Sequence, residues 1–469
     1  MNENHGLPLS VPQILPALDA YFRPAALVVR AFRERVRTSG QGVPVRLALE
    51  QADGSVFHFD KELFDERCPE ARGNYTFVER MVKFLLWSRG GCKVYFAGPA
   101  SVGERLKKHY MDNATGSFDA DIMGRRIYER PFEVVLVRRE DLPPAREKTV
   151  PLGRHLNGCR IGFDLGASDR KVAAVIDGQP VFTEEVVWNP VQQTDPQWHF
   201  DEIMDSLKRA AGHLPRVDAI GGSSAGVYVN NRVKVASLFR GVPSDLFERR
   251  VKDLFLEIKK AWNDIPFELV NDGEVTALAG SMSIGDNGVL GMALGSSLAA
   301  GYVTLDGRIT SWLNELAFAP VDYNPQAPVD EWSGDYGCGV QYLSQQGVGR
   351  LIPRAGIEVD EALPLPEKLK QVQKLMAAGD PRASKIYQTL GAYLGYALAH
   401  YADFYAIRNV LILGRVTTGE GGRVIMEGAK EVLRKIFPDV HQAIAFHIPD
   451  EKDKRHGQAV AAASLPVVG

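Results

Sequence analysis

The sequence of 469 residues is poor in the features that mark secreted, membrane and nucleic-acid-binding proteins. Its four cysteines, at positions 68, 92, 159 and 338, form no C-x-x-C pair, which favours reduced thiols over a disulfide framework or an iron–sulfur site. A formal net charge of −3 gives no electrostatic reason to bind nucleic acid or an anionic membrane. No apolar run is long enough to span a bilayer, and the start "MNENHGLPLSVPQ" lacks the regions of a signal peptide. We therefore expect a cytoplasmic protein without nucleic-acid or membrane partners.

The composition and length predict a globular protein of two or three domains. Hydrophobic residues make up 45% of the chain and charged residues 24%, as in soluble globular proteins. The proline-rich and basic stretch "LPPAREKTVPLGRHLNG" indicates a junction near residue 157. Ahead of it, the pattern predicts a hairpin around Asp53–Gly54, then a helix, a strand and another helix. We expect residues 1–157 to form a separate small α+β domain of unknown role, without a helix-turn-helix pattern.

Beyond the junction, strands, glycine turns and amphipathic helices alternate. The stretch "RIGFDLGASDRKVAAVID" has the order strand, glycine turn, strand, and "GVLGMALGSSLAAGYVTLDGRIT" repeats this order. Two similar α/β halves explain the repetition better than one long sheet. We place them at residues 158–285 and 286–469.

Several short motifs are better explained by structure or chance than by chemistry. The stretch "GGSSAG" contains G-x-S-x-G through Gly222, Ser224 and Gly226, but a hydrolase nucleophile elbow requires a helix directly afterwards. Here β-branched residues surround Asn230–Asn231, which predicts a hairpin instead. "SDRK" matches S-x-x-K by chance, "GRVTTGEG" lacks the P-loop lysine, and the histidines form no metal-ligand cluster.

The stretch "ELVNDGEVTALAG" has two interpretations. In the simpler one, Asn271 caps a helix and Glu274, three residues later, completes a capping box. In the other, Asp272 is a carboxylate held at the end of a strand, where it can deprotonate a substrate hydroxyl. Taken alone, the residues favour capping, and the choice depends on the rest of the chain.

Four segments in order along the chain resemble the ROK family (repressors, open reading frames and sugar kinases) of the actin-like ATPase superfamily. They are "FDLGASDRK", "VNDGEVTALAG", "LGSSLAAGYVTLDGRI" and "LILGRVTTGEGG". The family usually has D-x-G-G-T, N-D-x-N-x-A-A-L and L-G-T-G-x-G-x-G at the first three places, and an apolar strand ending in paired glycines at the last. The resemblance covers residues 158–469 and leaves the first third of the chain unexplained.

The resemblance implies an α/β fold of two actin-like (ribonuclease H-like) lobes around a nucleotide cleft, preceded by the small α+β domain. In such a fold the terminal helix can return to the first lobe. The implied cofactors are ATP and Mg²⁺, with Asp164 orienting the Mg²⁺ through water and Gly414 and Arg415 beside the adenosine. The phosphates are assigned to residues of the two turns: Gly166, Ser168, Gly295, Ser296 and Ser297.

The resemblance also implies an activity, the ATP-dependent phosphorylation of a sugar or sugar derivative. Asp272 would act as the general base on the sugar hydroxyl. Asn271 and Glu315 would bind neighbouring hydroxyls of the sugar. A small-molecule sugar is therefore the expected partner, and a homodimer is compatible with the resemblance.

The departures from the family pattern support an alternative function. Ala317 and Phe318 replace the glycine and histidine that follow the glutamate of A-G-E-x-G-H, and Val340 replaces a second sugar-binding glutamate. The zinc loop C-x-C-G-x-x-G-C becomes "EWSGDYGC", which keeps only Cys338, so we expect no structural zinc. The alternative is a catalytically weak or inactive regulatory protein that binds a sugar or nucleotide on the same fold.

Overall fold

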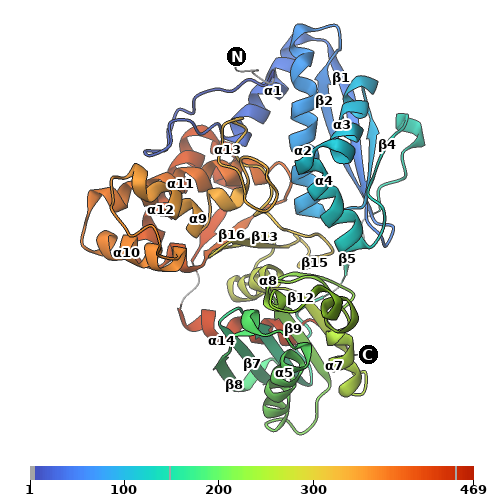
Figure 1. Cartoon of the computed structure of the whole chain (residues 1–469), viewed down its shortest axis with the longest axis vertical. Helices are drawn as coiled ribbons and strands as arrows, with labels where there is room; N and C mark the ends of the chain where they lie inside the picture. Colours follow the sequence, from blue (N-terminus) through green and yellow to red (C-terminus); the bar gives the residue numbers. More distant parts are fainter. Residues whose placement is uncertain (1–5, 147–148, 151, 449–450, 469) are drawn as a thin grey trace.

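The computed structural model describes residues 6–146, 149–150, 152–448 and 451–468, and it has three parts. In Figure 1 an N-terminal α+β unit (blue) lies above a first α/β lobe (green), and a second α/β lobe (yellow to orange) lies beside and between them. The expected class, two lobes of one α/β type preceded by a small α+β unit, is confirmed.

The N-terminal unit is a four-stranded sheet in the order β2-β1-β3-β4 with helices packed on it. The expected hairpin forms because Asp53 accepts a hydrogen bond from the Ser55 amide and Gly54 has a φ of 81°. The elements of the unit are α1 (Ala25–Ser39), β1 (Gly42–Glu50), β2 (Val56–Phe64), α2 (Asn74–Arg89), β3 (Lys93–Ala97), α3 (Ala100–Asp112), α4 (Ala114–Ala120), a π-helical segment (Asp121–Tyr128) and β4 (Glu133–Leu136).

The first lobe is built on a sheet in the order β12-β9-β6-β7-β8. Strands β6, β7 and β8 form an antiparallel meander, and β9 and β12 add in parallel on the other side of β6. The stretch "DLFERRVKDLFLEIKKAW" (residues 245–262), whose amphipathic pattern predicts one helix, is instead broken by a π-helical turn at Phe247–Val251. The elements are β6 (Cys159–Leu165), β7 (Asp169–Ile176), β8 (Gln179–Val187), α5 (Pro196–Ala211), β9 (Ala219–Ser224), β10 (Val227–Val229), β11 (Arg232–Val235), α6 (Ser244–Leu246), α7 (Leu254–Ala261) and β12 (Phe267–Asn271).

The second lobe repeats this arrangement, with a sheet in the order β17-β16-β13-β14-β15-β5. Strands β13, β14 and β15 form the meander, and β16 and β17 add in parallel beside β13. Strand β5 comes from the proline-rich junction and extends this sheet at β15. The elements are β5 (Thr149–Val150), β13 (Val289–Leu294), β14 (Leu298–Val303), β15 (Ile309–Thr310), α9 (Gln345–Arg354), α10 (Leu365–Ala377), α11 (Pro381–Tyr401), β16 (Asn409–Leu413), α12 (Gly419–Ile436), α13 (Pro438–Ala443) and β17 (Ala445–His447).

Two helices link the lobes. The last helix, α14 (Glu451–Ala463), leaves the second lobe and packs on β6, β7 and β9 of the first, as the red helix beside the green lobe in Figure 1 shows. Gly162 of β6 permits this contact, because a Cβ there would lie 1.7 Å from the carbonyl oxygen of Ala459. Helix α8 (Asp272–Ile284) follows β12 of the first lobe and packs on β13 and β14 of the second.

Helix α11 forms the centre of the helical layer of the second lobe. It packs against α12 and against α1 of the N-terminal unit. A strap of residues 7–24 also runs along it, with the Leu18 amide donating to Thr389 at 3.1 Å and the Tyr396 hydroxyl donating to the carbonyl of Ile14 at 3.2 Å. Among the described residues, no helix is at once long enough and apolar enough to cross a membrane.

The N-terminal unit packs closely on the second lobe. Its buried side chains and those of the second lobe belong to one continuous hydrophobic cluster, in which Phe84 stacks on Phe404 with ring centroids 3.9 Å apart. The unit also reaches the first lobe, where Glu129 pairs with Lys234 at 2.9 Å and with Lys252 at 3.2 Å. Patterns within residues 1–157 could not predict this packing, because the apolar partners lie hundreds of residues away.

The close approach of α8 to β14 gives the first testable prediction. A Cβ at Gly301 would lie 2.1 Å from the carbonyl oxygen of Gly273, so Gly301→Ala must push α8 away from the sheet. We expect a loss of about 1–3 kcal/mol in the free energy of unfolding, the usual range for overpacking, measured by urea denaturation. Gly457→Ala in α14 is the control, because nothing lies within 4 Å of the added Cβ. Equal stabilities of the two variants would contradict the predicted contact.

Candidate active site at the junction of the lobes

The carboxyl ends of three parallel strands of the first lobe bring the candidate residues together. Asp164 of β6 pairs in register with Ser223 of β9, and Asn271 of β12 pairs with Ser224. Asp272 begins α8 directly after β12. Ligands of open α/β sheets bind beyond the carboxyl ends of the strands, which makes this edge the place to look for a site.

Asp164 is buried and already has two partners. The Ser223 hydroxyl donates to its Oδ1 at 2.7 Å, and Lys171 Nζ lies 3.6 Å from its Oδ2. Lys171 stands opposite Asp164 in the β6–β7 hairpin and also pairs with Asp169 at 3.0 Å. Burial raises the pKa of Asp164, and the charge of Lys171 opposes that rise. A positive charge therefore stands beside the carboxylate that the family resemblance assigns to Mg²⁺.

Asn271 has the capping role of the simpler interpretation. Its Oδ1 accepts from the Gly273 amide at 2.7 Å, and its Nδ2 donates to the carbonyl of Gly226 at 2.7 Å. The rest of the expected capping box does not form, because the Glu274 carboxylate accepts a hydrogen bond from Asn314 instead. One N–H of the Asn271 amide is left for another acceptor, so capping and a ligand contact are compatible.

Asp272 and Glu315 are half-buried and come from opposite lobes. Burial, with the charge of Asp164, raises the pKa of Asp272 to about 6. Burial, with the charge of Asp272, raises the pKa of Glu315 to about 7. The charge of Asp272 therefore disfavours ionisation of Glu315, and both carboxyls approach the range in which a general base works near neutral pH.

Asn314 fixes the main chain next to Glu315. It is 1% exposed and has a φ of 51°, a left-handed conformation that asparagine tolerates better than most residues. Its Oδ1 accepts from the Tyr405 hydroxyl at 2.8 Å, and its Nδ2 donates to Glu274. Burial raises the pKa of Glu274 to about 8, although the hydrogen bond from Asn314 opposes the rise. Backbone strain of this kind persists where the surroundings hold it.

Each of the two glycine turns, at Gly166 and Gly295, is closed by a hydrogen bond of its own main chain. Neither Gly166 nor Gly295 has a positive φ, and each amide is donated within its own turn, to Asp169 at 2.9 Å and to Ser297 at 2.9 Å. The exposed residues of the turns are Ala167, Ser168, Ser296 and Ser297. In these turns, the exposed residues and their hydroxyls are the groups that are available to contact a phosphate.

The residues expected beside the adenosine lie next to the second turn. Gly414 has a φ of 103°, and a Cβ there would lie 2.5 Å from the carbonyl oxygen of Leu294. Arg415 is exposed, and its charge reaches the first lobe. Burial raises the pKa of Asp169, but Lys171, Ser168 and Arg415 outweigh it, so the pKa is lowered. Arg415 of the second lobe therefore lies near enough to the first turn for its charge to act on Asp169.

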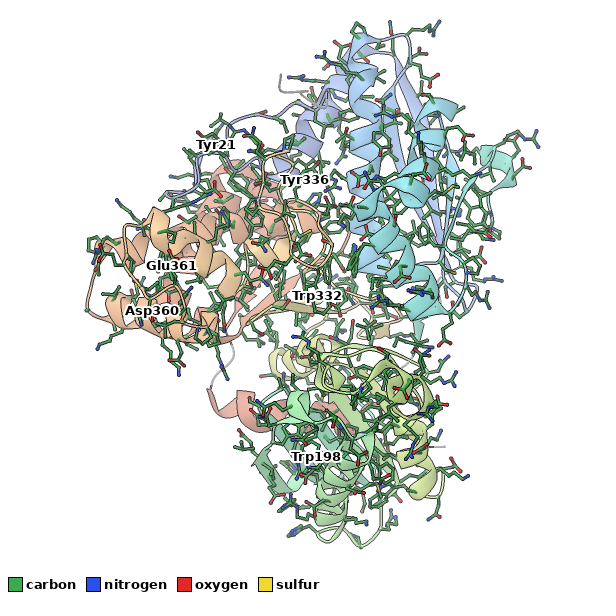
Figure 2. All side chains as sticks on the ribbon, viewed as in Figure 1. Tyr21, Trp198, Trp332, Tyr336, Asp360 and Glu361 are labelled. Carbon is green, nitrogen blue, oxygen red and sulfur yellow. The ribbon has the colours of Figure 1, made fainter. Side chains whose placement is uncertain are left out.

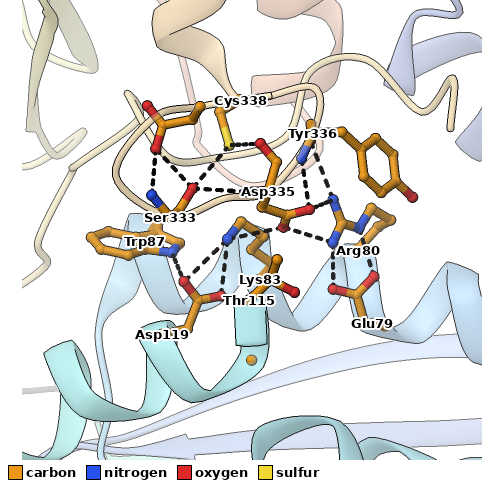
Figure 3. A network of polar contacts seen from close by, with 12 residues as sticks. Glu79, Arg80, Lys83, Trp87, Thr115, Asp119, Ser333, Asp335, Tyr336 and Cys338 are labelled. Atoms are coloured by element: carbon orange, nitrogen blue, oxygen red, sulfur yellow. Dashed lines mark hydrogen bonds and ion pairs between the residues drawn. The ribbon is translucent and has the colours of Figure 1, made fainter. Parts of the chain in front are cut away.

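The loop that contains Cys338 is held by protein side chains (Figure 3). Cys338 is fully buried, burial raises its pKa to about 12, and its thiol donates to the carbonyl of Asp335 at 3.6 Å. Ser333 donates to Asp330 at 2.8 Å. Within the described parts of the chain, no group of three or more His, Cys, Asp and Glu side chains is arranged to hold a metal ion.

The structure excludes a nucleophile elbow at "GGSSAG". The predicted hairpin β10–β11 follows the motif, with Asn230 and Asn231 both in the left-handed region. Ser224 is fully buried, and its hydroxyl oxygen accepts from the Tyr228 hydroxyl at 2.7 Å. A serine without access to solvent cannot serve as an exposed nucleophile.

Sequence patterns missed several residues of the site. Lys171 was present in the dismissed "SDRK" match, and its position opposite Asp164 could have been found from the hairpin register. Ser223 lies one residue before the serine of the dismissed elbow motif. Asn314 gave no sequence signal, since its partners Glu274 and Tyr405 are distant along the chain.

Comparison with known proteins agrees with this geometry at the level of the fold. No protein-family model matches the sequence, and no curated protein is found as a relative. Among solved structures, a ROK hexokinase from Thermus thermophilus is 18% identical, with a TM-score of 0.50 over 65% of this chain and 97% of the hexokinase. A ROK-family transcriptional regulator, a homologue of the E. coli MLC protein, is 21% identical, with a TM-score of 0.51 over 66% of this chain and 79% of the regulator.

A ROK-family glucokinase from Streptomyces griseus, solved with glucose and AMPPNP, is 19% identical, with a TM-score of 0.50 over 66% of this chain and 99% of the glucokinase. The chain therefore has the two-lobed fold of the actin-like ATPases. More narrowly, it has the fold of the ROK kinases and regulators, and the resemblance seen in the sequence is confirmed at that level. The matched share corresponds in length to residues 158–469.

The composition of the Cys338 loop predicts that the purified protein contains no stoichiometric zinc. A structural zinc site needs four strong ligands, and the neighbouring Ser333 and Asp335 are engaged in hydrogen bonds and ion pairs. Elemental analysis of protein dialysed against a mild chelator is the measurement. One tightly held zinc ion per chain would overturn the prediction.

The raised pKa of Asp272 predicts how its replacement changes stability with pH. The carboxyl of Asp272 has a pKa of about 6 in the folded protein, against an ordinary value of 3.8. The folded state therefore favours the neutral carboxyl, and the protein loses free energy of unfolding as the pH rises from about 4 to 6 and this carboxyl ionises. Asp272→Asn removes this loss of stability, because the asparagine side chain does not ionise. One pKa unit corresponds to about 1.4 kcal/mol, so we expect the variant to be more stable by about 1–3 kcal/mol at pH 8 and little changed at pH 4.

Urea unfolding of both proteins at the two pH values measures the difference. Asp245→Asn is the control, because Asp245 is 69% exposed and lies in a surface ion pair with Arg249, so the change should be small at either pH. A variant that is less stable than the wild type at pH 8 would contradict the raised pKa of Asp272.

Proposed function

We propose that the protein is an ATP-dependent kinase of a sugar or a sugar derivative. The observation that carries the proposal is the pair Asp272 and Glu315, two half-buried carboxylates from opposite lobes whose charges interact at the carboxyl end of β12. The exposed serines of the two turns, Lys171 and Arg415 add phosphate-binding groups. The glucokinase with the same fold was solved with glucose and AMPPNP, which supports a sugar and a nucleotide as ligands.

The proposed reaction transfers the γ-phosphoryl group of ATP to a sugar hydroxyl. Asp272 accepts the proton of that hydroxyl as its oxygen forms a bond to the γ-phosphorus, and the bond from this phosphorus to the bridging oxygen of ADP breaks. Glu315 and the remaining N–H of Asn271 hold neighbouring hydroxyls and so orient the attacking oxygen. Lys171, the hydroxyls of Ser168 and Ser296 and the turn amides offset the negative charge on the phosphates.

Mg²⁺ fits the residues present only in part. Asp164 is the buried carboxylate nearest the first turn, but Ser223 donates to one of its oxygens and Lys171 lies beside the other. When bound, Mg²⁺ supplies positive charge to the phosphate oxygens. Asp164 would hold it through water, and Lys171 contributes charge of the same sign from the protein itself.

A second candidate is a protein that binds a sugar or nucleotide on this fold without efficient catalysis. The Lys171–Asp164 pair favours it, because the lysine competes with a hydrated metal ion for the carboxylate. One structure with the same fold is a transcriptional regulator, so the fold also serves proteins named for regulation. The two candidates make different predictions for Asp272.

Asp272→Asn should abolish most of the sugar-dependent release of ADP. Asparagine nearly keeps the shape and can still begin α8, but it cannot accept the proton, so we expect turnover to fall about 10²- to 10⁴-fold. The assay measures ADP release over a panel of hexoses and amino sugars, with nucleotide affinity measured separately. Asp245→Asn serves again as the control and should keep the wild-type rate.

Equal rates of wild type and Asp272→Asn would remove Asp272 from the mechanism. A wild type that binds a sugar by calorimetry but releases no ADP with any sugar would favour the second candidate. A wild type that binds neither a sugar nor a nucleotide would contradict both candidate functions.

A further inference from the structure

The last turn of helix α2, in the N-terminal unit, holds the main chain of the candidate sugar-binding segment. The Asn314 amide donates to the carbonyl of Ser88 at 3.0 Å, and the Glu315 amide donates to the carbonyl of Trp87 at 2.9 Å. The last carbonyls of a helix have no partner within the helix, so they are available to bind another segment. The Trp87 ring also stacks on Phe318, with centroids 4.2 Å apart.

A buried cluster of charges joins the same helix to the loop 330–338 (Figure 3). Lys83 is completely buried and lies 3.0 Å from Asp119 of the N-terminal unit and 3.0 Å from Asp335 of the loop. Arg80 pairs with Asp335 at 2.8 Å and with Glu79 at 2.6 Å. Burial alone would raise the pKa of Asp335, but the charges of Arg80 and Lys83 hold it well below its usual range. Buried charges of this kind are tolerated only while they remain paired.

The loop held by this cluster pairs with the sugar-binding segment. The amides of Gly339 and Val340 donate to the carbonyls of Ala319 and Ala317, each at 2.9 Å. Trp87 connects the two attachments, because its Nε1 donates to Asp119 at 2.9 Å while its ring packs on Phe318. A displacement of this loop would therefore shift the main chain within a few residues of Glu315.

The outer end of this loop lies toward the first lobe. Trp332 is 58% exposed, and the Arg240 guanidinium of the first lobe lies 5.5 Å from its ring centroid. Figure 2 shows Trp332 at the edge of the second lobe that faces the first, and Tyr336 higher up, beside the N-terminal unit. The loop therefore extends from α2 to Arg240 of the first lobe.

We propose that helix α2 is a positioning element of the candidate sugar site. It fixes Glu315 through the Trp87 and Ser88 carbonyls, and it fixes the loop 330–338 through the Lys83–Asp335 ion pair. Lys83 and Trp87 are thus positioning residues that act through Glu315 and Asp335. The part that concerns the sugar rests on the proposed function, whereas the part that concerns the two segments does not.

Lys83→Met tests the ion pair, because methionine fills much of the same space without the charge. Hydrogen exchange measured by mass spectrometry should show amides of residues 314–318 and 330–340 exchanging about tenfold faster or more, with peptides of β6 and β9 unchanged. The sugar KM should rise about 10- to 100-fold, the range for loss of a supporting residue, while the nucleotide KM stays within about twofold. Arg46→Met, which removes a half-exposed ion pair with Asp60 in the same unit, is the control.

Trp87→Phe and Trp87→Leu keep the test decisive if Lys83→Met does not fold. Phenylalanine keeps a ring to stack on Phe318 but loses the indole N–H that bonds Asp119, whereas leucine loses both, so exchange and the sugar KM should increase more in Trp87→Leu than in Trp87→Phe. If no sugar is phosphorylated by the wild type, the exchange measurement still decides the role of α2 while the proposed function fails. Unchanged exchange in folded Lys83→Met and Trp87→Leu, or an equal rise in the sugar and nucleotide KM values, would overturn the proposal.

Discussion

The close contact between α8 and β14 is the constraint on which the candidate site depends. Gly273 and Gly301 meet backbone to backbone, at a separation that leaves no room for a side chain on either residue. This contact brings the first turn of a helix that starts in the first lobe against the sheet of the second. Asp272 consequently lies near enough to Glu315 for its charge to raise the pKa of that carboxyl, and burial raises the pKa of both.

The charges at the junction are compensated unevenly. At the first turn the single cation of Lys171 lies beside two carboxyl groups, those of Asp164 and Asp169. Asp272 and Glu315 have no cation among the causes of their pKa shifts, and burial disfavours their ionised forms. A site that leaves two carboxylates poorly solvated loses stability but gains groups able to accept a proton near neutral pH. The proposed phosphoryl transfer rests on these two carboxylates.

The N-terminal third of the chain takes part in both lobes. It shares a hydrophobic core with the second lobe, extends a strap along α11 and pairs Glu129 with two lysines of the first lobe. Its buried cations hold the Cys338 loop, where the family pattern that the sequence resembles has a zinc site. The buried ion pairs of this cluster connect that loop to the N-terminal unit and so fix its position relative to the unit.

The sequence alone determined the repeat of strand, glycine turn and strand, the hairpins at Asp53–Gly54 and Asn230–Asn231, and the identity of Asp164 and Asp272 as carboxylates at strand ends. These features are local, because turn residues and apolar periodicity act over a few positions. Only the tertiary structure decided that Ser223 donates to Asp164, that Glu274 bonds Asn314 rather than completing a capping box, and that Lys83 meets Asp335. Each of these pairs depends on burial and on the approach of segments that are distant along the chain. No periodic pattern in the sequence indicates such contacts.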